Sequence, residues 1–239
     1  MSIERLLEHF CPNNHLSILD LGCGKGALVA YLRQQGHDAY GCDIAGSDAS
    51  NFVPDQQADG ILRTIQPDPY RLPFDDNKFD CVVSDQVLEH VMDYDSTFRE
   101  IHRVLKPGGI SLHVFPSRYT FIEPHVFVPV ATLIRNRTWL YFWALLGVRN
   151  QFQQGNDARE VTRLNYRYLN AHTNYPTRAE IRKHGRHFSE QAFREDVFFI
   201  PDPRISLSLK KRLFVMFGGD WLRTRIWGSF VMSALYLRK

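Results

Sequence analysis

The chain has 239 residues, 44% of them hydrophobic, which suffices for one large domain or for one domain with a sizeable insertion. Its first ten residues lack the apolar core of a secretory signal, and no apolar run reaches the roughly 18 residues of a membrane span, so we expect a cytoplasmic protein. The net charge of +3 combines −8 in residues 1–117 with +11 in residues 118–239, which favours an anionic partner for the basic half unless the two halves attract each other.

Strand-like and helix-like segments alternate along the first half of the chain. Buried strands are predicted over residues 16–21, 38–43, 61–65, 79–84 and 110–115. Helices are predicted over residues 3–10, 27–35 and 86–105, the second ending before Gly36 and the third before Lys106-Pro107-Gly108-Gly109. Because strands alternate with helices at this spacing, the sequence predicts an α/β fold with a parallel, doubly wound sheet.

The alternation ends after Pro116. Residues 117–175 are rich in aromatic residues and arginine and show no strand–helix repeat. Within them, residues 138–148 (TWLYFWALLGV) form an apolar helix candidate that is too short to span a bilayer. Such a helix can wall an apolar pocket, lie on a membrane surface or pack on the core, and these alternatives stay open.

Regular elements return in the last part of the chain. A helix is predicted over 176–184, where Thr177 and Glu180 have the spacing of a capping box. Strands are predicted over 197–200 and 230–237, the latter at the edge of the sheet. We therefore divide the chain into a ligand-binding core at residues 1–116, a lid or substrate insertion at 117–175, and the remainder of the sheet with C-terminal helices at 176–239.

A glycine-rich turn follows the first strand in the stretch ILDLGCGKGALV at residues 18–29. Glycine allows backbone angles that other residues avoid and lets a ligand approach the main chain. In an open parallel sheet this turn lies at the carboxyl ends of the strands, where ligands bind. Gly22, Gly24 and Ala27 satisfy the dinucleotide fingerprint G-x-G-x-x-G/A, although that signal is weak alone.

Acidic residues on either side of this turn narrow the choice of ligand. Asp20 stands two residues before the first glycine, where a carboxylate suits an amino group better than a pyrophosphate. Asp43 ends the second predicted strand, and an acid there can accept hydrogen bonds from both ribose hydroxyls. The residues thus predict a nucleoside ligand with a free ribose diol.

Taken together, these segments resemble the class I S-adenosylmethionine (SAM)-dependent methyltransferases of type 11, the branch with UbiE-like and UbiG-like enzymes. The resemblance covers about residues 16–117 and rests on the following segments: ILDLGCGKG at 18–26, Asp43, DPYRLPFDDNKFDCVVSDQVLEHV at 68–91 and REIHRVLKPGGISLHVFPS at 99–117. It implies a Rossmann-like, seven-stranded, mostly parallel sheet with a helical lid after the fifth strand. It also implies SAM as cofactor and S-adenosylhomocysteine as product.

The resemblance assigns the first group of SAM contacts to the glycine turn and the second strand. Asp20 and the backbone of Gly22, Gly24 and Gly26 would hold the methionine part of SAM. Asp43 would hold the ribose hydroxyls.

A second group of contacts is implied farther along the chain. Asp68 would face the adenine amino group, with Pro69 and Tyr70 beside the ring. Ser84 and Asp85, at the end of the fourth strand, would line the sulfonium end.

A hydroxyl acceptor calls for a general base, and the candidates follow the fourth and fifth strands. His113 lies inside ISLHVF and is expected to be a buried histidine of the sheet. Glu123 and His125 flank a proline in a loop, where packing explains a charged pair poorly. We predict His125 as base or acceptor contact and Glu123 as its orienting partner. Glu89 and His90 are expected to cap and pack a helix.

Metal and thiol chemistry are not indicated. No metal-ligating constellation is evident, so no metal is predicted. The four cysteines lack the close spacing of a zinc site and are expected to be reduced, mostly buried thiols: Cys11, Cys23, Cys42 and Cys81.

The favoured interpretation is a methyltransferase that acts on a small-molecule acceptor. The expected target is a hydroxyl of an apolar or phosphate-bearing compound, such as a lipid, a glycan precursor or a natural product. An RNA methyltransferase is the first alternative, although no RNA-binding module is visible, and a non-catalytic SAM-binding protein is the second. Contact with a membrane surface and the oligomeric state stay open.

Overall fold

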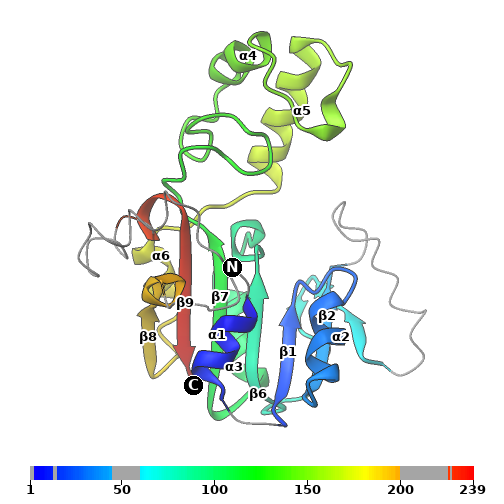
Figure 1. Ribbon diagram of the computed structural model, residues 1–239, viewed down its shortest axis with the longest axis vertical. Helices are drawn as coiled ribbons and strands as arrows, with labels where there is room; N and C mark the ends of the chain where they lie inside the picture. Colours follow the sequence, from blue (N-terminus) through cyan, green and yellow to red (C-terminus); the bar gives the residue numbers. More distant parts are fainter. Residues whose placement is uncertain (1–2, 13–14, 45–59, 200–225, 227) are drawn as a thin grey trace.

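The computed structural model describes residues 3–12, 15–44, 60–199, 226 and 228–239. A seven-stranded sheet with the order β3-β2-β1-β6-β7-β9-β8 lies at its centre (Figure 1). The strands are β1 (Ser17–Leu21), β2 (Asp38–Asp43), β3 (Leu62–Thr64), β6 (Phe79–Asp85), β7 (Leu105–Pro116), β8 (Glu190–Phe193) and β9 (Met232–Arg238). Neighbouring strands from β3 to β7 are parallel, and β9 is antiparallel to both β7 and β8. The predicted mostly parallel, doubly wound sheet is confirmed.

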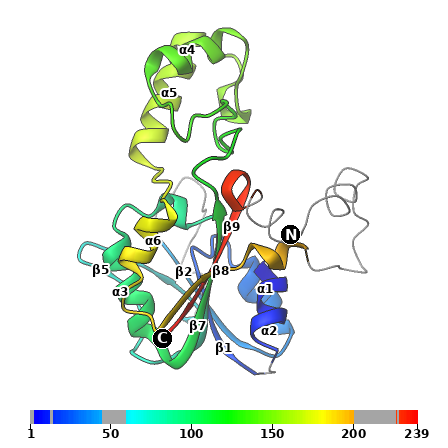
Figure 2. The same cartoon turned by 90° about the vertical axis from the view of Figure 1, so that its left-hand side faces the viewer.

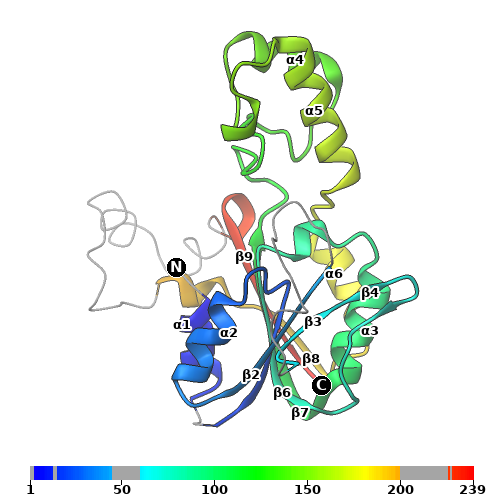
Figure 3. The same ribbon diagram turned by 90° about the vertical axis from the view of Figure 1, so that its right-hand side faces the viewer.

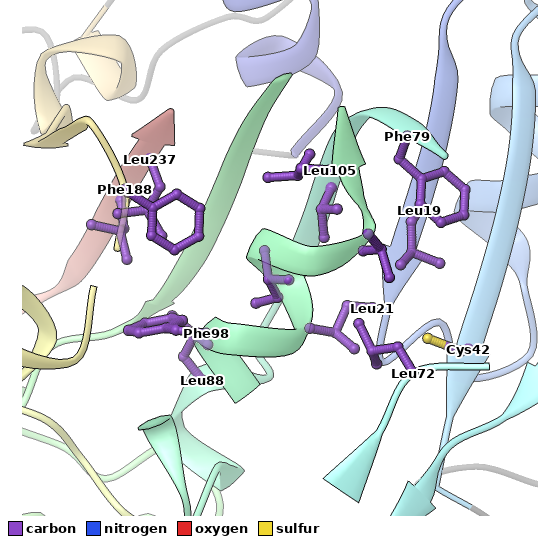
Figure 4. Close-up of a cluster of buried hydrophobic side chains, with 14 of the residues drawn as sticks. Leu19, Leu21, Cys42, Leu72, Phe79, Leu88, Phe98, Leu105, Phe188 and Leu237 are labelled. Carbon is purple, nitrogen blue, oxygen red and sulfur yellow. The ribbon is translucent and has the colours of Figure 1, made fainter. Parts of the chain in front are cut away.

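Helices cover both faces of the sheet (Figure 2). The helices α1 (Ile3–Phe10) and α2 (Ala27–Gln34) lie on one face, and α3 (Tyr94–Val104) and α6 (Arg178–His184) lie on the other (Figure 3). Successive side chains of a strand point to opposite faces, so Ile18 packs on the α1 side and Leu19 and Leu21 on the α3 side (Figure 4). With both faces covered, the ends of the strands are the places where a ligand can reach the sheet.

The chain between β6 and β7 differs from the predicted helix over 86–105. Gln86 has a left-handed backbone with φ of 57°, and only a short 3-10 helix, η2 (Leu88–His90), follows it. The α-helix begins at Tyr94, because the Asp93 side chain caps its first turn by accepting hydrogen bonds from two backbone N–H groups. The helix ends at Val104, in agreement with the stop predicted at 106–109, and residues 106–109 themselves lie inside β7, where the register with β6 shifts.

The last part of the sheet also differs from the prediction. The described part of the predicted strand at 197–200 is a 3-10 helix, η4 (Glu195–Phe199), whose Val197 is buried in the core on the α1 side. β8 was not predicted, because its short sequence EQAF has no apolar alternation. Since β8 lies outside β9, β9 is an inner strand rather than the predicted edge.

Residues 117–175 extend beyond the end of the sheet where β6 and β7 finish (Figure 1). They contain α4 (Arg137–Leu145), the 3-10 helix η3 (Gln151–Gln153) and α5 (Ala158–Ala171). Leu140 of α4 and Leu169 of α5 form a separate apolar cluster with Val126, Val128 and Ala131 of the preceding loop. The apolar helix predicted over 138–148 is therefore present as α4, whereas the three-part division of the chain stays a prediction.

A few remaining features complete the fold. A two-stranded hairpin joins β4 (Gln66–Pro67) to β5 (Tyr70–Arg71). The four cysteines are free and, except for the half-buried Cys11, buried, as predicted. Among the helices in the described ranges, none is both long and apolar enough to cross a membrane. The basic stretches at 210–212 and 221–225 fall outside the described residues.

Candidate functional site

The glycine turn after β1 forms one wall of the candidate site. Gly22, Gly24 and Gly26 have φ values of 75°, 50° and 77°, which favour glycine. A Cβ atom on Gly22 would lie 2.4 Å from Val87 Cγ2, and one on Gly26 would lie 2.8 Å from Leu62 Cδ1. A Cβ atom on Gly24 would meet no atom of the described residues within 4 Å. At Gly22 and Gly26 the positive φ and the nearby side chains both favour glycine, while among the described residues Gly24 leaves open space over the main chain, which fits a bound ligand.

Asp43 joins this turn to the end of β2. Its Oδ2 atom accepts a hydrogen bond from the Gly24 N–H at 2.9 Å, and its Oδ1 atom accepts one from the Ile44 N–H at 2.7 Å. Each carboxylate oxygen can accept a further hydrogen bond. The arrangement therefore fits a carboxylate that orders the turn and still offers acceptors to a ribose diol.

Asp20 is the buried acid of the site. It lies on β1 with 5% of its surface exposed. Burial, together with the charges of Asp43 and Asp85, raises the pKa of Asp20 to about 7. A carboxyl group in this position is stabilised by a nearby positive charge, so the site fits a cationic ligand such as one with an ammonium group.

The residues expected around adenine lie in the β4–β5 hairpin. Asp68 and Pro69 are exposed in its turn and are joined by a cis peptide bond. Tyr70 is half-buried and packs against the core on the α3 side, where burial raises the pKa of its hydroxyl. Their roles toward adenine stay predictions.

Ser84 and Asp85 end β6 but face different surroundings. The Ser84 hydroxyl is fully buried and lies 2.7 Å from Nδ1 of His113, whose Nε2 lies 2.7 Å from the Ser111 hydroxyl. Burial lowers the pKa of His113 to about 3, so this ring is neutral, and the prediction of a buried sheet histidine is confirmed. Asp85 is exposed at the strand end. Because its hydroxyl is buried beside His113, Ser84 could contact a ligand only through its backbone atoms.

Glu123 and His125 form a tightly bonded pair in the loop after β7. The Glu123 carboxylate is buried and accepts hydrogen bonds from His125 Nδ1 at 2.8 Å and from the Tyr175 hydroxyl at 2.5 Å. Its other oxygen accepts the backbone N–H groups of His125 and Val126 at 2.8 and 2.7 Å. Burial opposes ionisation, but these hydrogen bonds outweigh it and lower the pKa of Glu123.

The His125 ring is held between Glu123 and the neighbouring aromatic rings. Its side chain is 25% exposed, and its ring lies 4.9 Å from that of His90 and 5.4 Å from that of Tyr168. Burial lowers the pKa of His125, but the hydrogen bond and charge of Glu123 outweigh it and raise the pKa above the usual value. Since Nδ1 faces Glu123, Nε2 is the nitrogen left for a ligand.

Glu89 and His90, on η2, join this pair in space. The Glu89 side chain is fully buried, and neither carboxylate oxygen has a hydrogen-bond partner among the described residues. It therefore does not cap a helix, contrary to the prediction, and burial raises its pKa to about 8. His90 Nδ1 lies 2.7 Å from the His172 carbonyl oxygen. Ligand atoms of Glu89, His90 and His125 all lie within 4.8 Å of one another.

Three residues of this site were missed by the sequence analysis as functional candidates. Glu89 and His90 were assigned to helix packing, although an adjacent Glu-His pair just after a strand end was a usable signal. Tyr175 carries no signal in its local sequence, because only the fold brings it to Glu123 from 52 residues away.

Comparison with known proteins finds a match to a methyltransferase domain within the first half of the chain. Residues 19–112 match the family described as "Methyltransferase domain". A malonyl-[acyl-carrier protein] O-methyltransferase of Erwinia pyrifoliae is 37% identical over 106 residues, which cover 44% of this chain and 39% of the relative. The ubiquinone/menaquinone biosynthesis C-methyltransferase UbiE of Vibrio cholerae is 39% identical over 100 residues, or 38% of each chain. This chain thus spans about two fifths of the length of these relatives.

A solved structure shares the fold over nearly the whole chain. The S-adenosylmethionine-dependent methyltransferase of Mesorhizobium loti aligns with a TM-score of 0.53 at 15% identity, covering 95% of this chain and 92% of that one. At this identity the likeness concerns the fold alone. It agrees with a Rossmann-like arrangement that includes the late strands.

Proposed function

Because residues 19–112 belong to the type 11 family of class I SAM-dependent methyltransferases, we propose that the chain transfers a methyl group from SAM to a hydroxyl of a small-molecule acceptor. Two features carry this proposal, and both follow the carboxyl ends of parallel strands of the sheet, β1 and β7. One is the glycine turn with open space at Gly24, and the other is the bonded pair of Glu123 and His125.

The residues that would hold SAM are those of the turn and the neighbouring strand ends. Asp20 supplies a carboxylate for the amino group, and Asp43 supplies acceptors for the ribose hydroxyls. The main chain at Gly24 is open to the methionine part. When bound, SAM supplies a methyl group that its sulfonium already activates. The protein's part is then to orient the acceptor and exclude water, a contribution on the order of 7–11 kcal/mol.

The acceptor hydroxyl needs a proton acceptor, and we assign this role to Nε2 of His125. Glu123 accepts a hydrogen bond from Nδ1–H of His125, which fixes the tautomer with a lone pair on Nε2. Tyr175 donates to the same carboxylate oxygen and holds it in place. This arrangement provides a general base beside the end of β6 without requiring a charged histidine in the resting state.

The acceptor's chemistry is suggested by residues 117–175, which we propose to act as a lid. Large apolar side chains on and beside α4 are exposed: Tyr141, Phe142, Leu145, Leu146 and Phe152. A groove of about 430 Å³ on α5 is lined by Arg137, Arg163 and Arg167 among others. Exposed apolar and cationic groups on one lid favour an apolar or phosphate-bearing acceptor.

The same side chains support a contact between the lid and a membrane surface. Aromatic and arginine residues favour the interface of anionic bilayers. Sedimentation with vesicles of anionic and of zwitterionic lipids tests this contact. Binding that requires anionic lipid and is lost in Phe142→Ser/Leu146→Ser agrees with it, and equal recovery of the variant and the parent chain refutes it.

A transfer experiment tests the proposed function directly. Purified protein is incubated with methyl-labelled SAM and separate pools of total lipid, glycan precursors, small RNA and polar metabolites. Label in a lipid, glycan or metabolite fraction, lost in His125→Ala, is the expected result. Label confined to RNA would replace this proposal with the RNA alternative. SAM binding without transfer to any pool would favour the non-catalytic alternative.

A further inference from the structure

The cluster of Glu89, His90 and His125 has the composition of a cation site. Two imidazoles and one carboxylate offer ligand atoms within 4.8 Å of one another. They come from two separate segments, η2 after β6 and the loop after β7. Their convergence is therefore a product of the fold rather than of one local motif.

Both histidines are prepared for binding through Nε2. His90 Nδ1 is bonded to the His172 carbonyl oxygen at 2.7 Å, so that nitrogen carries the proton. His125 Nδ1 is bonded to the Glu123 carboxylate at 2.8 Å. Metal-binding histidines in proteins commonly donate their second ring N–H to a carbonyl or a carboxylate, which fixes the tautomer and orients the ring. Both histidines of the cluster show this arrangement.

Glu89 provides an independent observation that points to a ligand. The side chain is fully buried, and both of its oxygens lack a hydrogen-bond partner in the part of the chain that the structure describes. An unpartnered buried carboxyl group is costly, and buried acidic groups are normally paired with a cation or coordinate a metal.

We propose that Glu89, His90 and His125 bind one divalent first-row transition-metal ion. Imidazole nitrogens favour zinc, iron(II) and similar ions over magnesium or calcium, which prefer oxygen ligands. Three protein ligands leave coordination positions open. Oxygen atoms of an acceptor, such as a hydroxyl and a neighbouring carbonyl or second hydroxyl, suit these positions.

The site goes beyond the proposed function and does not depend on it. Nε2 of His125 serves as base in that function and as ligand here, so the two roles exclude each other in the metal-loaded protein. Glu89 and His90 have no part in the proposed proton transfer. Variants of these two residues therefore test the cation site alone.

Metal titration of the full chain, without a histidine tag, tests the proposal. Protein stripped by a chelator is titrated with zinc or with cobalt(II), whose absorption reports nitrogen and oxygen ligands. We expect one equivalent per chain, with affinity lowered on the order of 100-fold in Glu89→Gln and in His90→Gln. Glu123→Gln, which changes the hydrogen-bond partner of His125 Nδ1 but none of the three proposed ligands, should lower affinity about 10- to 100-fold. His187→Gln changes an exposed histidine outside the cluster and should leave affinity unchanged.

Thermal unfolding separates binding from loss of folding. Zinc should raise the unfolding temperature of the parent chain and of His187→Gln, but not of Glu89→Gln. Equal affinity in the parent chain, Glu89→Gln and His90→Gln would overturn the proposal. Methyl transfer is not measured here, so failure of the proposed function leaves this result untouched. Conversely, methyl transfer that persists after the metal is removed by a chelator would leave the result of the metal titration unchanged.

Discussion

Glu123 binds both the main chain and the ring of His125, with Oε2 2.8 Å from the backbone nitrogen and Oε1 2.8 Å from Nδ1. A carboxylate held at both points fixes the position of the imidazole as well as its tautomer. The Tyr175 hydroxyl, on the same Oε1 atom, ties the pair to the end of the 117–175 segment. The loop thus presents His125 Nε2 in one orientation, which is what a general base requires.

The first prediction concerns the pH dependence of methyl transfer. His125 acts as a base only when it is neutral, and its pKa lies above the usual value of 6.5 chiefly because the Glu123 interaction outweighs burial. In the parent chain, activity should therefore fall as the pH drops through a value above 6.5. Glu123→Gln removes the charge, so the acidic limb of the kcat profile should move to lower pH.

His125→Ala completes this test. It should reduce kcat by about 10²- to 10⁴-fold, the usual contribution of a general base, while SAM affinity measured by calorimetry stays near normal. Glu123→Gln should give an intermediate kcat. An acidic limb at the same pH in Glu123→Gln and the parent chain would exclude the orienting role.

The second prediction uses two glycines that share their backbone conformation. Gly24 and Gly108 have φ of 50° and 77°, and in the part of the chain that the structure describes a Cβ atom on either would meet nothing within 4 Å. Valine at either position should lower the free energy of unfolding by a similar amount, about 1–2 kcal/mol. Only Gly24→Val should lose SAM binding, because only Gly24 borders the proposed ligand. Calorimetry on both variants decides this, and equal SAM affinity would remove Gly24 from the site.

Local sequence patterns were sufficient for most of the strands and helices up to the end of β6. The strand at 38–43 and the helix from residue 27 were predicted from apolar spacing and glycine boundaries, which act over a few residues. The helix predicted to start directly after β6 was wrong, because the turn at Gln86 and the cap at Asp93 interrupt a pattern that is helical in the sequence. β8 escaped prediction because its place is set by antiparallel pairing with β9, about 40 residues later.

In the candidate site, too, the sequence predicted the residues that carry a local signal and missed those that only tertiary contacts bring together. Asp20, Asp43 and the glycines lie at the ends of predicted strands, so the topology placed them together. His125 and Glu123 were found because packing explained a charged loop pair poorly. The unpartnered state of Glu89 and the approach of Tyr175 depend on tertiary contacts that the neighbouring residues do not encode.

The third prediction concerns the buried group of Ser84, His113 and Ser111. Ser111→Ala should destabilise the protein by about 1–3 kcal/mol, because it leaves the His113 Nε2 atom without its close partner in the core. Methyl transfer per folded molecule should not change. Ser84→Ala removes the matching bond to Nδ1 and should have a similar cost in denaturant unfolding. A fall in SAM affinity in Ser84→Ala alone would show that its side chain, despite burial, influences the ligand.

The same group predicts an effect of acid. His113 has a pKa of about 3 in the folded protein against 6.5 for an unperturbed histidine. Between these pH values the residue is therefore protonated in the unfolded chain but neutral in the folded chain. This residue's contribution to stability is therefore complete above pH 6.5 and declines as the pH falls from 6.5 toward 3. Denaturant midpoints of the parent chain and His113→Gln across this range measure it, and parallel curves would contradict the assignment.

The last prediction contrasts stability with ligand binding at Asp20. Its pKa is about 7 in the folded protein against 3.8 for an ordinary aspartate, so the folded state retains a proton that the unfolded state releases. The stability of the ligand-free protein should fall as the pH rises from 3.8 to 7, and the full penalty should persist above pH 7. Asp20→Asn carries no such penalty and should unfold at higher denaturant concentration than the parent chain at pH 8, but not at pH 4. SAM affinity should move in the opposite direction, falling about 10- to 100-fold in Asp20→Asn, as for the loss of a hydrogen bond to a charged group. A variant that is both less stable at pH 8 and unchanged in SAM affinity would show that Asp20 is a structural residue of β1 and not a ligand contact.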